Sequence, residues 1–181
     1  MEKMIYLDNN ATTKVDEQVL EAMMPYFKEE YANPSSMYDF AKKSSDAIKV
    51  ARKQVQEFLG ASSDKEIIFT SCGSESANTA IKGVLANNRT KRHIITTAVE
   101  HPCVLNLYQA YEKQGYKVDY IGVNSNGELN IKELEDKITD ETALVSVMWA
   151  NNETGIVFPV KEIAEIVKEK NPTTMVYVDA V

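Results

Sequence analysis

The chain has 181 residues, of which 44% are hydrophobic and 26% charged, as is ordinary for one soluble globular domain. Its formal net charge of −7 disfavours general binding to nucleic acid or to an anionic membrane. The sequence has no apolar run of roughly 18 residues, no signal-peptide pattern and only two cysteines, Cys72 and Cys103, in no metal-binding spacing, so we expect a reduced, cytoplasmic protein without a structural metal.

Two amphipathic segments near the N-terminus predict helices. One lies near 16–28, and Pro25 is expected to kink or end it because proline lacks the N–H donor of a helix interior. The other lies near 38–59, where apolar residues recur with a helical period, and Gly60 is expected to end it. Loops rich in Asn, Thr, Ser and Pro are expected at 8–15 and 31–37.

From residue 66 onward, short β-rich runs alternate with amphipathic stretches. Strands are expected at 66–70, 93–96, 118–121, 143–148 and 175–178. Helices are expected at 75–86, 102–113, 131–137 and 160–169. This alternation predicts an α/β domain in which a mostly parallel sheet lies between helices.

Small, polar or ionisable residues follow four of the five expected strands. They are Gly73 and Ser74 after the first strand, His101 after the second, Asn152 after the fourth, and Asp179 after the fifth. Ligands bind at the carboxyl ends of the strands in open parallel sheets. If the strands are parallel neighbours, these residues converge on one edge and form the candidate site.

Gly73 and Ser74 open a helix directly after an expected strand. A helix N-terminus offers unpaired N–H groups and the positive end of a dipole, which suits phosphate. Glycine lets the backbone approach closely, and the serine hydroxyl adds a donor. Ordinary helix capping by Ser71 or Ser74 is the alternative. The sequence has neither a Walker lysine nor G-x-G-x-x-G, so neither common nucleotide signature applies.

The other candidate residues each have a functional and a structural interpretation. His101, at a strand-to-helix turn, suits stacking on a flat ligand or proton transfer, or it is satisfied within a loop. Asn152 suits donation to an anionic oxygen, or it belongs to an ordinary turn. Asp179 ends a central strand and needs a partner, either a protonated pyridine nitrogen or a structural ion pair, or it caps the next turn. His93 is expected to be structural.

Six segments, taken in order, carry a family resemblance. They are Tyr6-Leu7-Asp8-Asn9-Asn10-Ala11-Thr12-Thr13, Asn33-Pro34-Ser35-Ser36, Phe69-Thr70-Ser71-Cys72-Gly73-Ser74-Glu75-Ser76, Glu100-His101-Pro102, Ser146-Val147-Met148-Trp149-Ala150-Asn151-Asn152-Glu153-Thr154-Gly155 and Asp179. Together they resemble the NifS-like cysteine desulfurases of the class V aminotransferase family, over essentially the whole chain. Two positions depart from the pattern: Cys72 stands where many relatives have glycine, and Tyr38 where histidine is frequent.

The resemblance implies a fold-type I enzyme with the aspartate-aminotransferase-like architecture, a homodimer, and pyridoxal 5'-phosphate as cofactor. Gly73 and Ser74 match the phosphate-binding positions. His101 matches a catalytic histidine that stacks over the pyridine ring and handles protons. Asn152 matches the residue bonded to the ring hydroxyl oxygen, and Asp179 matches the partner of the pyridine nitrogen.

The family reaction converts L-cysteine to L-alanine and passes the sulfur, as an enzyme persulfide, to an iron–sulfur scaffold protein. The resemblance implies a Schiff-base lysine in a Ser-x-His-Lys context, a persulfide cysteine and a carboxylate-binding arginine, all expected beyond Val181. We therefore expect a fragment, inactive alone, with 1–15 belonging to the small domain and 16–181 to an incomplete large domain. Selenocysteine lyase is the alternative for the whole protein, and a non-catalytic binding module is the alternative for the fragment.

Neither cysteine of the chain matches the persulfide position of the family. Cys72 lies near an expected helix N-terminus, where a thiol pKa is commonly lowered, but this position does not make it the sulfur carrier.

Overall fold

The computed structural model describes residues 4–88 and 90–181. These residues form two compact units, one ending at Phe69 and the other beginning at Thr70. Among the described helices, none is both long enough and apolar enough to cross a membrane. The expected assignment of 1–15 and 16–181 to different domains stays a prediction.

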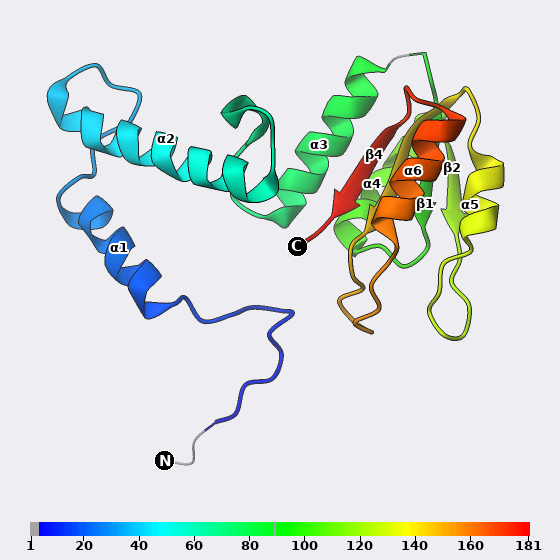
Figure 1. The fold of residues 1–181 in the computed structure, drawn as a ribbon, viewed down its shortest axis with the longest axis horizontal. Coiled ribbons are helices and arrows are strands. Elements are labelled where there is room, and N and C mark those ends of the chain that lie inside the picture. Colours follow the sequence, from blue (N-terminus) through cyan, green and yellow to red (C-terminus); the bar gives the residue numbers. More distant parts are fainter. Residues whose placement is uncertain (1–3, 89) are drawn as a thin grey trace. The chain divides into compact units, whose positions relative to one another are not determined.

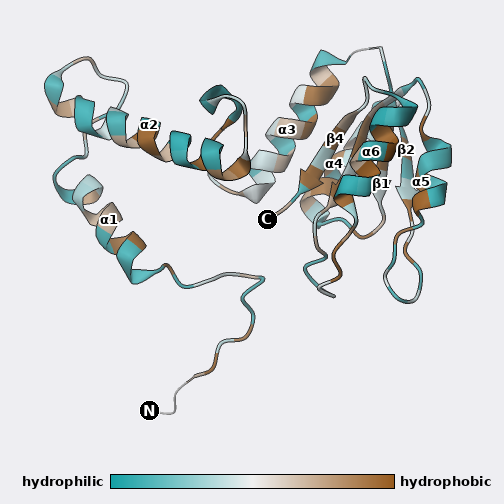
Figure 2. Ribbon diagram, in the orientation of Figure 1, coloured by the Kyte–Doolittle hydropathy of each residue, from teal (hydrophilic) through white to brown (hydrophobic). Residues whose placement is uncertain are grey.

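The first unit consists of helices α1 (Glu17–Lys28) and α2 (Asp39–Leu59) and the short 3-10 helix η1 (Asp64–Glu66). Pro25 lies inside α1, which continues to Lys28, so the proline does not end the helix. Gly60 follows α2 with a φ of 69°, the left-handed conformation that glycine adopts without strain, and this confirms the predicted helix end. Figure 2 shows hydrophobic and hydrophilic residues interspersed along α2.

Residues 66–70 do not form the expected strand, because they pair with no other strand in the described chain. The Arg52 guanidinium instead donates to the carbonyl of Ile67 and lies 4.9 Å from the centre of the Phe69 ring. Ile67 is buried, whereas Ile68 and Phe69 are exposed. The β-branched and aromatic composition was therefore misleading, since strand propensity acts only where a neighbouring strand is available.

The second unit is a three-layer α/β arrangement (Figure 1). Its strands are β1 (His93–Thr97), β2 (Lys117–Ile121), β3 (Thr142–Met148) and β4 (Met175–Asp179), in the order β2-β1-β3-β4. Its helices are α3 (Gly73–Asn87), α4 (Pro102–Glu112), α5 (Ile131–Lys137) and α6 (Val160–Lys170). All three strand pairings are parallel, which confirms the predicted α/β class.

Alternate residues along the strands face opposite helical layers. Ile94 faces one buried cluster, with residues of α3 and α4, and Ile95 faces another, with residues of α5 and α6. The first cluster contains Ala77, Ile81, Leu85, Val104, Leu107, Tyr108 and Leu144. The second contains Leu134, Val145, Val147, Ile163 and Val167. The period of two in the strands thus fills both faces of the sheet.

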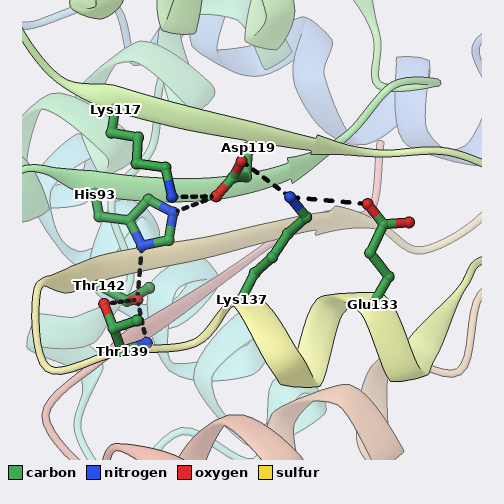
Figure 3. A network of polar contacts seen from close by, with 7 residues as sticks. All are labelled: His93, Lys117, Asp119, Glu133, Lys137, Thr139 and Thr142. Carbon is green, nitrogen blue, oxygen red and sulfur yellow. Dashed lines mark hydrogen bonds and ion pairs between the residues drawn. The ribbon is translucent and has the colours of Figure 1, made fainter.

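A polar network joins the beginnings of the strands, at the edge opposite the candidate site (Figure 3). His93 Nδ1 lies 2.9 Å from Thr142 Oγ1, and His93 Nε2 lies 2.9 Å from Asp119 Oδ2. Asp119 also accepts from Lys117 Nζ at 2.9 Å and Lys137 Nζ at 3.1 Å. Both nitrogens of the His93 ring thus contact side chains of neighbouring strands, which supports a structural role for this histidine.

The negative charge on Asp119 is expected to stabilise the folded chain at pH values above the ordinary pKa of an aspartate. Burial alone would raise the pKa of Asp119, but hydrogen bonds from Lys117, Lys137 and His93 outweigh burial and lower the pKa to about 2. Because the folded pKa lies below the usual 3.8, this contribution is present above pH 3.8 and is lost as the pH falls towards 2. At roughly 1.4 kcal/mol per pKa unit, it amounts to about 2 kcal/mol.

Asp119→Asn is therefore expected to lower the free energy of unfolding at pH 7 by about 2 kcal/mol and to flatten its fall below pH 4. Urea denaturation at pH 7 and at pH 3 measures both effects. Asp136→Asn is the control, because Asp136 pairs with Lys132 on an exposed helix face, where an ion pair contributes less than about 1 kcal/mol. Equal losses in the two variants would contradict the prediction.

Candidate functional site

The carboxyl ends of three strands meet at one edge of the sheet. Asp179 is the last residue of β4 and pairs in register with Met148, the last residue of β3. Four residues after the end of β1, His101 is the N-cap of α4. Gly73 begins α3, and a Cβ atom added there would lie 3.1 Å from Cγ2 of Val181, two residues after Asp179. The structure thus places Gly73 close to the segment that follows β4.

The N-terminus of α3 is not capped by a side chain. Cys72 is the N-cap residue and makes no capping hydrogen bond. The Ser71 hydroxyl and N–H both donate to the Glu75 carboxylate at 2.6 Å, so Ser71 does not supply the cap. The N–H of Glu75, the Ser71 hydroxyl and the N–H of Ser74 lower the pKa of the Cys72 thiol, as expected near a helix N-terminus. This helix end therefore already favours negative charge beside it.

Ser74 and His101 are linked through Cys103. His101 Nδ1 accepts the Cys103 N–H at 3.2 Å and lies 3.0 Å from Cys103 Sγ. Burial raises the pKa of the Cys103 thiol, and a hydrogen bond with the Ser74 side chain opposes this effect. A series of polar contacts thus connects the beginnings of α3 and α4.

Beyond strand pairing, the contacts that the structure describes for Asp179 come from backbone N–H groups. Its main-chain carbonyl accepts the Trp149 N–H at 2.6 Å, and its Oδ1 accepts the Val181 N–H at 3.2 Å. The pKa values of Cys103 and Tyr177 are raised chiefly by burial, and the negative charge of Asp179 raises both of them further. A carboxylate at this edge is complementary to a positively charged group of a ligand.

Asn152 lies in an exposed turn after β3, where its Nδ2 donates to Glu153 Oε1 at 3.3 Å. The neighbouring Asn151 organises the turn. Its Oδ1 accepts from the N–H groups of Glu153 and Thr154 and from the Thr154 hydroxyl, and its Nδ2 donates to the carbonyl of Val99 at 3.1 Å. Sequence reasoning assigned no role to Asn151, although an asparagine that begins a turn ending in glycine is a recognisable signal.

Glu100 is a second residue to which sequence reasoning gave no role. Its side chain is buried, with an exposed fraction of 4% for the residue. Its Oε1 accepts from the Thr97 hydroxyl at 2.8 Å and from the Met148 N–H at 2.8 Å, whereas its buried Oε2 has no partner among the described residues. Burial raises the pKa of Glu100 to about 7, with a contribution from the charge of Asp179. The Glu100 carboxyl therefore joins the ends of β1 and β3 directly before His101.

A family model described as Aminotransferase class-V matches residues 5–181, so the chain belongs to the class-V aminotransferase family. Within that family it is similar to proteins named as cysteine desulfurases. It is 55% identical to "Cysteine desulfurase" of Nostoc sp. and 46% identical to "Cysteine desulfurase NifS" of Azotobacter vinelandii, in each case over 98% of this chain and 44% of the relative.

Solved structures show the same similarity. A structure titled "NIFS-LIKE PROTEIN" matches with a TM-score of 0.94 and 44% identity, over 98% of this chain and 48% of that chain. One titled "SspA in complex with cysteine" matches with a TM-score of 0.90 and 38% identity, over 97% of this chain and 50% of that chain. The chain spans about 44% of the length of the curated relatives it matches. The predicted resemblance and fold class are both confirmed.

Proposed function

We propose that the whole protein represented by this chain is a pyridoxal-phosphate-dependent cysteine desulfurase. It would convert L-cysteine to L-alanine and pass the sulfur to an enzyme persulfide for iron–sulfur cluster assembly. The observation that supports this function best is the meeting of the α3 N-terminus, His101 and Asp179 at one edge of a parallel sheet. The names of the relatives support cysteine as the substrate.

The residues at this edge fit pyridoxal 5'-phosphate. The cofactor carries an anionic phosphate and a ring nitrogen that is cationic when protonated, so its site needs hydrogen-bond donors and a carboxylate. We assign the phosphate to Gly73 and Ser74, at the uncapped beginning of α3. We assign the ring nitrogen to Asp179, the ring hydroxyl oxygen to Asn152, and the ring face to His101.

Each assigned residue has a defined chemical task. When bound, the cofactor supplies an electron sink for the bonds around the substrate α-carbon. The Asp179 carboxylate favours a proton on the ring nitrogen, because a nearby negative charge stabilises the cationic form. The N–H groups and hydroxyl at the beginning of α3 anchor the phosphate, and His101, which is an exposed residue, holds or transfers a proton at Nε2.

For the 181-residue chain alone, we propose a cofactor-binding module rather than a catalyst. The printed sequence contains no Ser-x-His-Lys segment, which the family resemblance predicts for the lysine that bonds to the cofactor. Lys49 and Lys161 lie on exposed helix faces, where Lys49 pairs with Asp46 and Lys161 with Glu165. Selenocysteine lyase is the alternative for the whole protein, since it would use the same cofactor-binding residues.

We also propose that the whole protein is a homodimer that passes sulfur to an iron–sulfur scaffold protein. Large apolar side chains are exposed in the first unit, among them Phe27, Phe58 and Leu59. Such side chains are commonly covered by a protein partner. The scaffold partner follows from the family resemblance alone.

The test measures products and cofactor binding separately. The whole protein, given pyridoxal 5'-phosphate, L-cysteine and a thiol reductant, is expected to form alanine and sulfide in equal amounts. The 181-residue chain is expected to bind the cofactor, detected by a change in its absorbance, without forming alanine. L-Selenocysteine in place of L-cysteine distinguishes the lyase. Absence of alanine from L-cysteine with the whole protein would overturn the desulfurase function, and turnover by the 181-residue chain would overturn the binding-module proposal.

A further inference from the structure

The environment of His101 determines which ring nitrogen carries the proton. Nδ1 lies 3.2 Å from the backbone nitrogen of Cys103 and 3.0 Å from its Sγ. A backbone N–H can only donate a hydrogen bond, so this contact favours the tautomer in which Nδ1 accepts and carries no proton. A neutral imidazole carries one proton, which therefore lies on Nε2.

The thiol of Cys103 is a second donor to the same nitrogen. Because Nδ1 accepts, the contact from Sγ is a hydrogen bond only when the sulfur keeps its proton. Burial raises the pKa of this thiol most, and the charge of Asp179 adds a smaller increase. The hydrogen bond with Ser74 opposes them but is outweighed, so the thiol keeps its proton at neutral pH. Cys72, the other cysteine of the chain, has a lowered thiol pKa and no described contact with His101.

We propose that Cys103 is a positioning residue for His101: its N–H and its protonated thiol hold the imidazole as the tautomer with the proton on Nε2. His101 then presents a hydrogen-bond donor, rather than a lone pair, to an electron-rich atom of the bound ligand. The identity of that ligand rests on the function proposed above, whereas the tautomer rests only on contacts within the chain.

The same contacts make the opposite tautomer unfavourable. His101 is the N-cap of α4, and its Nδ1 satisfies the Cys103 N–H, one of the first N–H groups of the helix. A proton on Nδ1 would oppose that N–H and leave α4 without its side-chain cap. The neutral ring therefore offers its Nε2–H as a hydrogen-bond donor, while its lone pair on Nδ1 is used by the first turn of α4.

The composition of the chain allows a direct test, because the sequence contains only two histidines, His93 and His101. Long-range ¹H–¹⁵N correlation spectra of the ¹⁵N-histidine-labelled 181-residue chain report which nitrogen is protonated. They would be recorded without cofactor at about pH 8.5, some two units above the ordinary histidine pKa. His101→Gln assigns the signals, and His93, buried between Asp119 and Thr142, is the internal check of folding.

The wild-type chain is expected to show His101 with the proton on Nε2. In Cys103→Ala the ring loses one of its two donors, and both tautomer patterns are expected for His101, with the His93 signals unchanged. Cys103→Ser restores a donor and is expected to restore the single pattern, and Cys72→Ala is expected to match the wild type. A proton on Nδ1 in the wild type, or identical spectra for Cys103→Ala and Cys72→Ala, would overturn the proposal. No cofactor or substrate is present, so the result is independent of whether the whole protein is a desulfurase.

Discussion

Asp179→Ala is expected to lower alanine formation from L-cysteine in the whole protein by a hundred- to thousandfold, the usual loss when a fixed charge that stabilises the reacting system is removed. In the 181-residue chain, the same change is expected to weaken the affinity for pyridoxal 5'-phosphate about tenfold or more, since a hydrogen bond to a charged group contributes about 1.5–3 kcal/mol. Product analysis gives the first value, and an absorbance titration with the cofactor gives the second.

Two matched variants separate the charge of Asp179 from its shape. Asp179→Asn keeps the size of the side chain but removes the negative charge, so it is expected to lose nearly as much activity as the alanine variant. Asp140→Asn changes an exposed carboxylate just before β3, at the beginning of the strands, and is expected to behave as the wild type. Unchanged turnover in Asp179→Asn would refute the assignment of Asp179 to the ring nitrogen.

Glu100→Gln is expected to remove a pH dependence of the free energy of unfolding. The folded pKa of Glu100, about 7, lies above its usual 4.5, chiefly because of burial. The unfolded chain therefore releases this proton between pH 4.5 and 7 while the folded chain keeps it, so stability falls across that window and is level above it. At roughly 1.4 kcal/mol per pKa unit, the fall is about 3 kcal/mol. Glutamine stays neutral and its carbonyl still accepts from Thr97 and Met148.

The Glu100 variant should therefore match the wild type near pH 4.5 and exceed it by about 3 kcal/mol at pH 8. Urea denaturation across this range measures the difference. Glu169→Gln, at an exposed position of α6, is the control and is expected to leave the pH profile unchanged. Parallel profiles for the wild type and Glu100→Gln would show that Glu100 is ionised when buried.

Periodicity predicted the second unit well because its helices bury one face each, and its central strands β1 and β3 are buried along their whole length. The helix expected at 160–169 is α6, with Ile163 and Val167 buried, and the strand expected at 143–148 is β3. The run 66–70 has the same composition as a buried strand, but composition carries no information about whether a neighbouring strand exists. The same limit applies to α2, where Phe58 and Leu59 continue the apolar pattern yet are exposed.

The candidate site could be predicted in position but not in its internal connections. Parallel strands bring their carboxyl ends together, so Asp179 and His101 could be assigned to one edge from spacing alone. The bond between Glu100 and the Met148 N–H joins residues 48 positions apart, and the bond between Asn151 and the Val99 carbonyl joins residues 52 apart. Such contacts depend on the exact pairing of the strands, which hydrophobic patterns do not specify.

The pairing of β3 with β4 determines the side of the sheet on which Asp179 lies. Val178 packs with the α5 and α6 cluster and Tyr177 with the α3 and α4 cluster, so successive residues of β4 alternate between the faces. If β4 slipped by one residue along β3, a valine would replace the carboxylate at the α3 side, and Asp179 would turn towards apolar side chains of the opposite layer. The packing of Val176 and Val178 thus opposes a shifted register that would bury a charge, and the hydrophobic core helps to hold Asp179 at the edge where we propose that it meets the cofactor.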